Sequence, residues 1–200
     1  KGNIVKIVGD CIGDFYFNKT AAAYLWRYWK GDQPILYRQK KVRSDVNNKV
    51  VENHAYELVR FGVGQTYGEP LQCVSIEKEN EKIGEYVDVL NKYLKLCNKH
   101  AKNIRAGEWQ TATGSGFVAA GYNRKKNANC PFILTNPTPL NTFIIYSSIT
   151  EEPLVAVQEL EDIEGNSYKM CYTETHQCIL KDGSVQDWNL HAFGDIPIVE

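Results

Sequence analysis

The sequence predicts an α+β protein in which helices come first and an antiparallel β-meander follows. A helical stripe of apolar residues extends from Ile83 to Cys97, whereas short segments rich in β-branched and aromatic residues appear only after Gly114. Turn signals such as Asp182-Gly183 separate those later segments. We therefore expect a mainly helical part at residues 1–113 and an antiparallel β part at residues 114–200, which together form one continuous structural unit.

The composition is that of an ordinary globular domain. Of the 200 residues, 43% are hydrophobic and 24% are charged, which argues against disorder and collagen-like structure. The net charge of -1 lacks the basic excess of proteins that bind nucleic acid through its phosphates. No apolar run approaches the roughly 20 residues of a membrane span, so we expect no membrane partner. The 6 cysteines include no C-x-x-C pair, and we expect them to be reduced, in the cytoplasm.

Residues 15–30, FYFNKTAAAYLWRYWK, form the first predicted helix. The consecutive alanines favour helix, and Gly31 is a suitable residue to end it. Aromatic residues occupy more than one face of this segment, which permits two interpretations. It is either a core helix or a helix that packs on a neighbouring subunit, because aromatic residues are enriched at interfaces. The candidate interface residues are Tyr24, Trp26, Tyr28 and Trp29.

Further helices are predicted before residue 113. The second follows Asn47-Asn48, whose side chains are good N-caps, and glycines at positions 62, 64 and 68 end it. The third, with charged residues on its other face, carries the apolar stripe Ile83, Val87, Leu90, Leu94 and Cys97. The fourth spans about residues 99–111.

Strands are predicted throughout the second part. They cover residues 117–120, 132–134, 142–146, 154–160, 168–173 and 178–180. The short connections between them favour an antiparallel meander. In such a meander, Cys171 and Cys178 can face each other across a hairpin.

No arrangement of polar residues predicts chemistry, so we expect no catalytic residues, no metal site and no cofactor. The 4 histidines show no metal-ligand spacing. Gly114-Ser115-Gly116 follows a helix and precedes a strand, whereas a nucleophile elbow follows a strand and precedes a helix. The acidic residues between positions 159 and 164 do not match a calcium-binding loop.

Two alternatives stay open. The first is a cytoplasmic cysteine-dependent hydrolase in which His100 is the base for the Cys97 thiol. Against it, Cys97 falls on the apolar stripe, where a thiol is usually inert. The second alternative is a nucleic-acid-binding module that uses the basic loops at residues 38–41 and 124–126.

The region around the second predicted helix resembles a known family. Residues 46–59 read VNNKVVENHAYELV, and residues 64–71 read GQTYGEPL. They are similar to N-N-x-(aliphatic)-V-x-N-x-A-x-x-(aliphatic)-V followed by G-x-x-x-G-x-P in the portal proteins of tailed bacteriophages. The branch that they resemble most is that of siphophages and prophages of Gram-positive hosts. Upstream, residues 28–35 (YWKGDQPI) resemble the end of the family's tyrosine-rich helix.

Later segments resemble the same family in the same order. Residues 114–117 (GSGF) resemble the point at which a helix passes into a strand, and residues 139–146 (PLNTFIIY) resemble a strand with the pattern P-x-x-x-(hydrophobic)-I-I-Y. Residues 153–157 (PLVAV) follow at the expected place. Residues 193–200 (FGDIPIVE) are similar to the segment that precedes the family's long stem helix. The order and spacing of these motifs are more specific than any one of them.

The resemblance implies a structural subunit, not an enzyme, and assigns this chain to the outer, wing-like part of it. The stem and clip segments, which line the DNA channel and touch the packaging motor, are expected beyond residue 200, so no channel or motor-binding residue is carried over. The subunit is expected in a ring, usually a dodecamer, at one capsid vertex of the virion, after assembly in the host cytoplasm. The implied partners are sister copies, terminase, head-tail connector or adaptor proteins, capsid and scaffold proteins, and the double-stranded DNA that passes through the complete ring.

Overall fold

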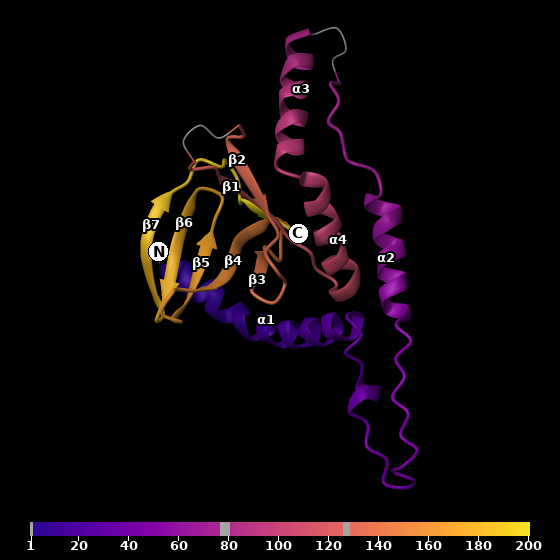
Figure 1. Cartoon of the computed structure of the whole chain (residues 1–200). Helices are drawn as coiled ribbons and strands as arrows, with labels where there is room; N and C mark the ends of the chain where they lie inside the picture. The colour runs from indigo at the N-terminus through magenta and orange to yellow at the C-terminus, as the bar shows by residue number, and fades with distance from the viewer. Residues whose placement is uncertain (1, 77–80, 126–128) are drawn as a thin grey trace.

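The computed structural model describes residues 2–76, 81–125 and 129–200. Lys126, at the end of the second predicted basic loop, therefore lies outside the described residues. Helices come first and antiparallel strands follow (Figure 1), which confirms the predicted α+β class.

The order of the elements within the described residues is as follows. The helices are α1 Gly2–Trp29, the short 3-10 helix η1 Pro34–Tyr37, α2 His54–Tyr67, α3 Glu81–Leu96 and α4 Lys99–Thr113. The strands are β1 Val118–Tyr122, β2 Phe132–Thr135, β3 Thr142–Tyr146, β4 Pro153–Glu161, β5 Ser167–Tyr172, β6 His176–Lys181, β7 Ser184–Leu190 and β8 Ile198–Val199.

The strands form two antiparallel sheets, whereas the sequence predicted one meander. The meander itself is a 5-stranded sheet in the order β3-β4-β5-β6-β7. A separate 3-stranded sheet has the order β2-β1-β8 and brings the last strand back beside the first. Strands β7 and β8 were not predicted. The pairing of Cys171 with Cys178 across the β5–β6 hairpin confirms that these two residues face each other.

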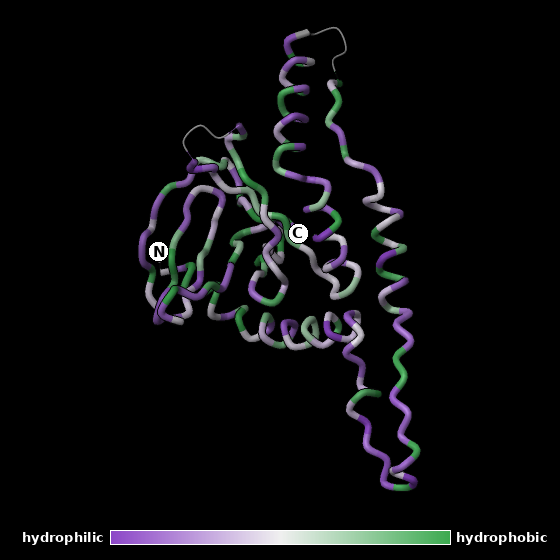
Figure 2. Tube along the Cα trace, in the orientation of Figure 1, coloured by the Kyte–Doolittle hydropathy of each residue, from purple (hydrophilic) through white to green (hydrophobic). Residues whose placement is uncertain are grey.

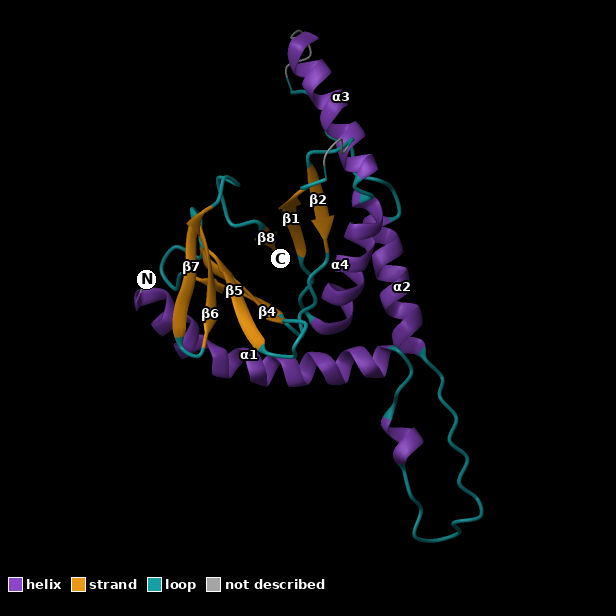
Figure 3. Cartoon of the chain, turned by 60° about the vertical axis from the view of Figure 1, so that its left-hand side comes forward, coloured by secondary structure: helices purple, strands orange, loops and turns teal. Residues whose placement is uncertain are grey.

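Helix α1 connects the two halves of the molecule and is longer than predicted, because it begins at Gly2 and not near Phe15. Its buried residues Val8, Phe15, Ala22 and Trp29 recur at intervals of seven, so they lie on one face. The N-terminal half of α1 packs under the five-stranded sheet, and its C-terminal end reaches α2 and α4 (Figure 3). Gly31 follows the helix with a φ of 94°, as expected for a helix-ending glycine.

The five-stranded sheet is covered on both faces. Val155 and Val157 of β4 point toward α1, where they pack with Ile4 and Val8. Ala156, between them, points to the opposite face and packs with residues of the small sheet and its connections. This alternation along one strand is the pattern of a sheet that is buried on both sides.

Helix α2 begins later than predicted. Asn53, not the pair Asn47-Asn48, is its N-cap, because the Asn53 side chain accepts a hydrogen bond from the Tyr56 N–H at 3.2 Å. The Asn53 amide also donates to the Trp29 carbonyl at 2.8 Å, which joins the start of α2 to the end of α1. The helix then continues through Gly62 and Gly64, which were expected to break it, since Val59 and Val63 are buried against its neighbours.

Helix α3 confirms the predicted third helix, but its apolar stripe is not a core face. None of its described residues is buried, and Leu90 is 40% exposed. Figure 1 shows why: most of α3 projects beyond the sheets, with α4 below it. The described part of the chain covers the helix only partly: the Asn91 side chain is hydrogen-bonded to the Cys73 backbone at 2.9 Å, and Tyr93 packs on Phe132 of β2.

A second projection follows η1. We call residues 38–53 the basic arm. It leaves η1, extends away from the sheets and returns to the start of α2 (Figures 1 and 3). Hydrophobic and hydrophilic residues are interspersed along it (Figure 2), so it has no core of its own.

Candidate functional site

The sequence-predicted aromatic residues gather where α1 meets α2 and α4. Trp26 stacks on Trp109 of α4 with ring centroids 3.3 Å apart, and it also contacts Trp29 at 4.6 Å. Trp29 is 2% exposed and packs with Val59 and Val63 of α2. The Lys30 ammonium lies 4.0 Å from the Trp29 ring centroid, within the range of a cation–π contact. Trp26 and Trp29 therefore hold three helices together within one subunit.

The other two candidate residues point outward. Tyr24 is 53% exposed and Tyr28 is 36% exposed, and their rings lie 6.3 Å apart. Together they form a small aromatic surface on the side of α1 away from the Trp26 and Trp29 packing. Of the four residues proposed from sequence, these are the ones with area available for a partner.

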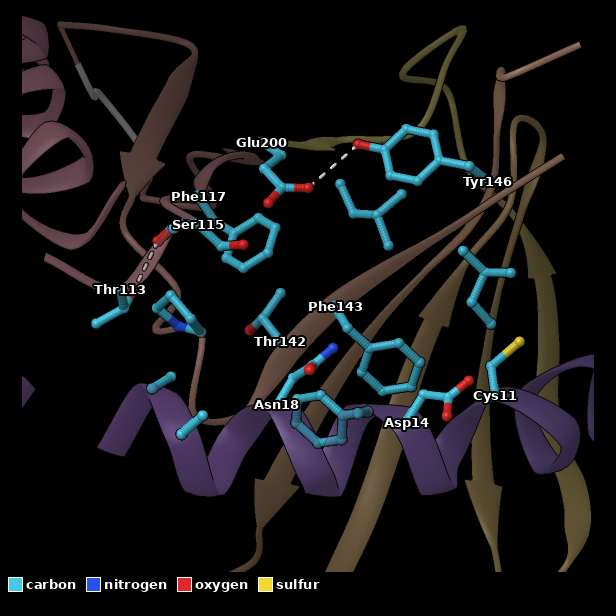
Figure 4. Close-up of a pocket in the computed structure, with 17 residues that line it drawn as sticks. Cys11, Asp14, Asn18, Thr113, Ser115, Phe117, Thr142, Phe143, Tyr146 and Glu200 are labelled. Atoms are coloured by element: carbon cyan, nitrogen blue, oxygen red, sulfur yellow. Dashed lines mark hydrogen bonds between the residues drawn. The ribbon is translucent and has the colours of Figure 1, made fainter. Parts of the chain in front are cut away.

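An open cleft lies between α1, strand β3 and the loop from α4 to β1. Its volume is about 510 Å³. Figure 4 shows Asn18 and Asp14 of α1 on one side, Phe143 in the middle and Glu200 on the other, where the Tyr146 hydroxyl donates to the Glu200 carboxylate at 3.4 Å. Phe15 stacks on Phe143 at 4.4 Å and closes the floor between helix and sheet. No arrangement of a nucleophile with a base is formed by the described residues that line it.

A partly buried carboxylate links α1 to the five-stranded sheet and was missed from sequence. Glu159 of β4 accepts a hydrogen bond from the Tyr16 hydroxyl at 2.7 Å and one from the Lys19 ammonium at 3.0 Å. Lys169 of β5 lies 3.6 Å away. Burial alone would raise the pKa of Glu159, but these donors outweigh it and hold the pKa below its usual value. The spacing of Tyr16 and Lys19, on one face of α1, is the only sequence signal for this site.

The thiol of Cys97 is not activated. Its Sγ lies 3.1 Å from the Sγ of Cys130 and 3.2 Å from the carbonyl of Phe132. Burial and the neighbouring Cys130 thiol raise the pKa of Cys97 to about 11, so little thiolate exists at neutral pH. His100 makes no hydrogen bond to Cys97 among the described residues, which removes the geometric basis of the hydrolase alternative.

The exposed surface is much larger than that of a compact protein. The chain exposes 13,964 Å², whereas a compact monomer of 22.8 kDa exposes about 9,600 Å². The difference of about 4,400 Å² exceeds what a subunit buries in two standard interfaces, which is about 1,600 Å² in total. Large apolar residues contribute to it on α2 and α3, among them Leu58, Phe61 and Tyr86, each at least 68% exposed. Such surface is typical of a subunit that packs against other proteins.

In the part of the chain that the structure describes, no helix has both the length and the apolar character of a bilayer span. No curated protein matches the chain. Residues 18–200, nearly the whole sequence, match the family described as "Phage portal protein, SPP1 Gp6-like". The order of motifs, the helices followed by antiparallel strands and this match agree: the chain belongs to the phage portal protein family, a family of structural proteins of bacteriophages.

Proposed function

We propose that this chain forms the wing of a portal subunit, the outer part of a ring at one vertex of the capsid. The observation that carries the proposal is the exposed surface of 13,964 Å² on a family member of this size. Neighbours in a ring bury surface on two sides of every subunit, which accounts for exposed apolar residues far from the core.

The wing acts as one continuous unit in this proposal. The helical residues 1–113 and the β residues 114–200 share α1, which packs both under the sheet through Ile4 and Val8 and against the helices through Trp29. Helix α4 adds a second link, because it contacts β1 and β2 and the Asn136 amide donates to its Lys102 carbonyl at 3.0 Å.

Membership of the portal family supports the finer roles in this proposal. The complete ring, a dodecamer in our proposal, passes double-stranded DNA during packaging and ejection. It holds terminase on one side and head-tail connector proteins on the other, and it contacts capsid and scaffold proteins. Assembly takes place in the host cytoplasm, and the finished subunit resides in the virion. Tyr24 and Tyr28 contribute to contacts with these partners or with sister copies.

The test is the position of the subunit in the virion together with its requirement for packaging. An antibody label on the subunit is expected at a single vertex of each particle, where the tail joins, whereas a label on the major capsid protein covers the shell. Deletion of the gene is expected to give particles without DNA. Label spread over the whole shell, or normal DNA content after deletion, would contradict the proposal.

A further inference from the structure

Charge is strongly segregated along this nearly neutral chain. Residues 1–146 contain 21 basic and 13 acidic side chains, a net charge of +8. Residues 147–200 contain 2 basic and 11 acidic side chains, a net charge of -9. A subunit that carries both signs on separate surfaces has the complementarity required for a head-to-tail contact with its own copy.

The basic arm is exposed along most of its length. Its basic residues, Arg38, Lys40, Lys41, Arg43 and Lys49, outnumber Asp45 and Glu52. Among the described residues, none of these five side chains forms an ion pair, although the Lys40 ammonium donates to the Val46 carbonyl at 2.8 Å. Four valines lie among these charges, and Val42 is 79% exposed. The arm therefore offers unpaired cations beside apolar side chains.

A matching surface lies at one end of the five-stranded sheet. The β4–β5 turn and the β6–β7 turn lie at the same end, because successive strands of the meander are antiparallel. They carry Glu161, Asp162, Glu164 and Asp182, which we call the acidic edge. The Asp162 carboxylate accepts hydrogen bonds from the backbone N–H groups of Glu164 and Asn166 within its own turn. Glu161 and Glu164 are exposed, and Ile163 between them is fully exposed.

Helix α1 keeps the two surfaces apart within one subunit. The acidic edge lies next to Glu159, which is bound to Lys19. The chain that leads through η1 into the arm leaves α1 after Trp29, about 15 Å further along the helix. From there the arm runs away from the sheets in both views (Figures 1 and 3). A contact between arm and edge therefore requires two copies, with the arm of one facing the sheet of the next.

We propose that the basic arm of each subunit docks on the acidic edge of its neighbour, with Val42 and Val46 against Ile163. The proposal rests on the proposed ring, for which it names the contact between copies. Such a contact is heterologous, and it closes into a ring when the same rotation repeats. The occupant of the acidic edge is a second copy of this chain, because the edge repels nucleic acid and the arm supplies charge of the required sign.

Cysteine cross-linking in assembled rings of the complete subunit tests the contact. In a Cys73→Ser background, which removes the exposed native thiol, Arg43→Cys is combined with Glu164→Cys and treated with a short bismaleimide. The expected result is a ladder of covalent dimers, trimers and larger species on a denaturing gel. The matched control combines Arg43→Cys with Glu174→Cys, which lies in the exposed β5–β6 turn at the other end of the sheet, and is expected to remain monomeric.

Charge reversal supplies an independent readout. Lys41→Glu with Arg43→Glu, or Glu161→Lys with Glu164→Lys, is expected to slow ring assembly at low salt by about tenfold or more, because the steering charges then repel. The four substitutions together restore assembly to within about threefold of the parent. Arg124→Glu with Lys125→Glu, in the other basic loop, leaves the rate unchanged.

The results that would contradict the contact can be distinguished from those that would contradict the proposed ring. Rings that form normally but give no ladder with Arg43→Cys and Glu164→Cys overturn this contact and leave the proposed ring in place. Loss of salt-sensitive DNA binding in the arm variant, with unchanged assembly, overturns it in favour of a nucleic-acid contact. Absence of rings in the parent overturns the proposed function and the contact with it.

Discussion

The indole of Trp26 on α1 lies parallel to the indole of Trp109 on α4, with ring centroids 3.3 Å apart and an angle of 7° between the planes. The stack fixes the end of a long helix to the helical half of the subunit. Trp29 adds a second contact from the same turn of α1 to α2. Half of the aromatic residues expected at an interface thus stabilise the subunit itself.

Truncation of this stack is expected to destabilise the fold. Trp109 is 3% exposed, so Trp109→Ala should lower the free energy of unfolding by about 3–5 kcal/mol. Tyr24→Ala, at a residue that is 53% exposed, should change it by less than about 0.5 kcal/mol. Urea denaturation of the two variants measures the difference. Equal effects would show that the stack does not hold α1 to α4.

The exposed tyrosines are expected to matter for assembly and not for folding. Tyr24→Ala combined with Tyr28→Ala should raise the subunit concentration at half-assembly by about tenfold, the effect of losing roughly 1.4 kcal/mol at an interface. The melting temperature should stay close to that of the parent. Analytical ultracentrifugation measures assembly, and unchanged assembly would remove these residues from the proposed contacts.

A close approach between α2 and α4 depends on Gly107. A Cβ at this position would lie 2.5 Å from the Tyr67 ring, which is closer than real side chains approach. Gly107→Ala should therefore cost about 1–3 kcal/mol of stability through overpacking. Tyr67→Ala removes the clash. The variant with both substitutions should therefore lose less free energy of unfolding than the sum of the losses in the two single variants. Strict additivity would contradict this packing.

The stability contributed by Glu159 is expected to depend on pH. Its pKa is held below the usual value, so the contribution is complete above about pH 4.3, the pKa in the unfolded chain, and is lost as pH falls through the folded pKa. Glu159→Gln should lower the free energy of unfolding by about 1–2 kcal/mol at pH 7. The loss should be smaller at acidic pH, where the parent carboxylate is protonated. Glu151→Gln, at an exposed carboxylate, is the matched control. A deficit that persists unchanged below the folded pKa would contradict the assignment.

Alkylation should distinguish a structural thiol from a catalytic one. With iodoacetamide at neutral pH, the exposed Cys73 should react first, and Cys97 slowly, because burial and Cys130 keep Cys97 protonated. Cys73→Ser should remove the fast phase, which mass spectrometry of tryptic peptides can follow. Rapid labelling of Cys97 would restore the hydrolase alternative.

The elements that the sequence predicted well are those with an uninterrupted period. The stripe from Ile83 to Cys97 predicted α3, and the alternation of Tyr168, Met170 and Tyr172 with Lys169, Cys171 and Thr173 predicted β5. Their periodicity comes from local geometry, which one sequence displays directly. The exposure of α3 did not follow from its stripe, because an apolar stripe predicts burial without saying which chain supplies the other side.

The elements that the sequence did not predict, β7, β8 and the first half of α1, lack a regular spacing of apolar residues or contain residues that obscure it. In β7, Val185 and Trp188 both pack toward the core although they lie three residues apart, because the ladder shifts register opposite Gln177 and Ile179. Strand β8 has two residues and no period to detect. The first half of α1 contains Gly9 and Gly13, which lower helix propensity, although the seven-residue spacing of Val8, Phe15, Ala22 and Trp29 could have revealed it.

The start of α2 and the candidate site needed tertiary information. Asn47 and Asn53 have equal capping propensity, but Asn53 also binds the Trp29 carbonyl, whereas Asn47 donates to the Arg38 carbonyl within the basic arm. In the same way, residue type alone selected four aromatic residues on α1 as interface candidates. Only the packing of the helices shows that Trp29 is buried and Tyr24 exposed.

The native mass and shape of the purified complete subunit test the central claim most directly. Mass photometry with negative-stain electron microscopy is expected to show closed rings with a central hole and a mass that is an integral multiple of the subunit. A subunit that stays monomeric across the accessible concentrations, while folded by circular dichroism, would contradict the account.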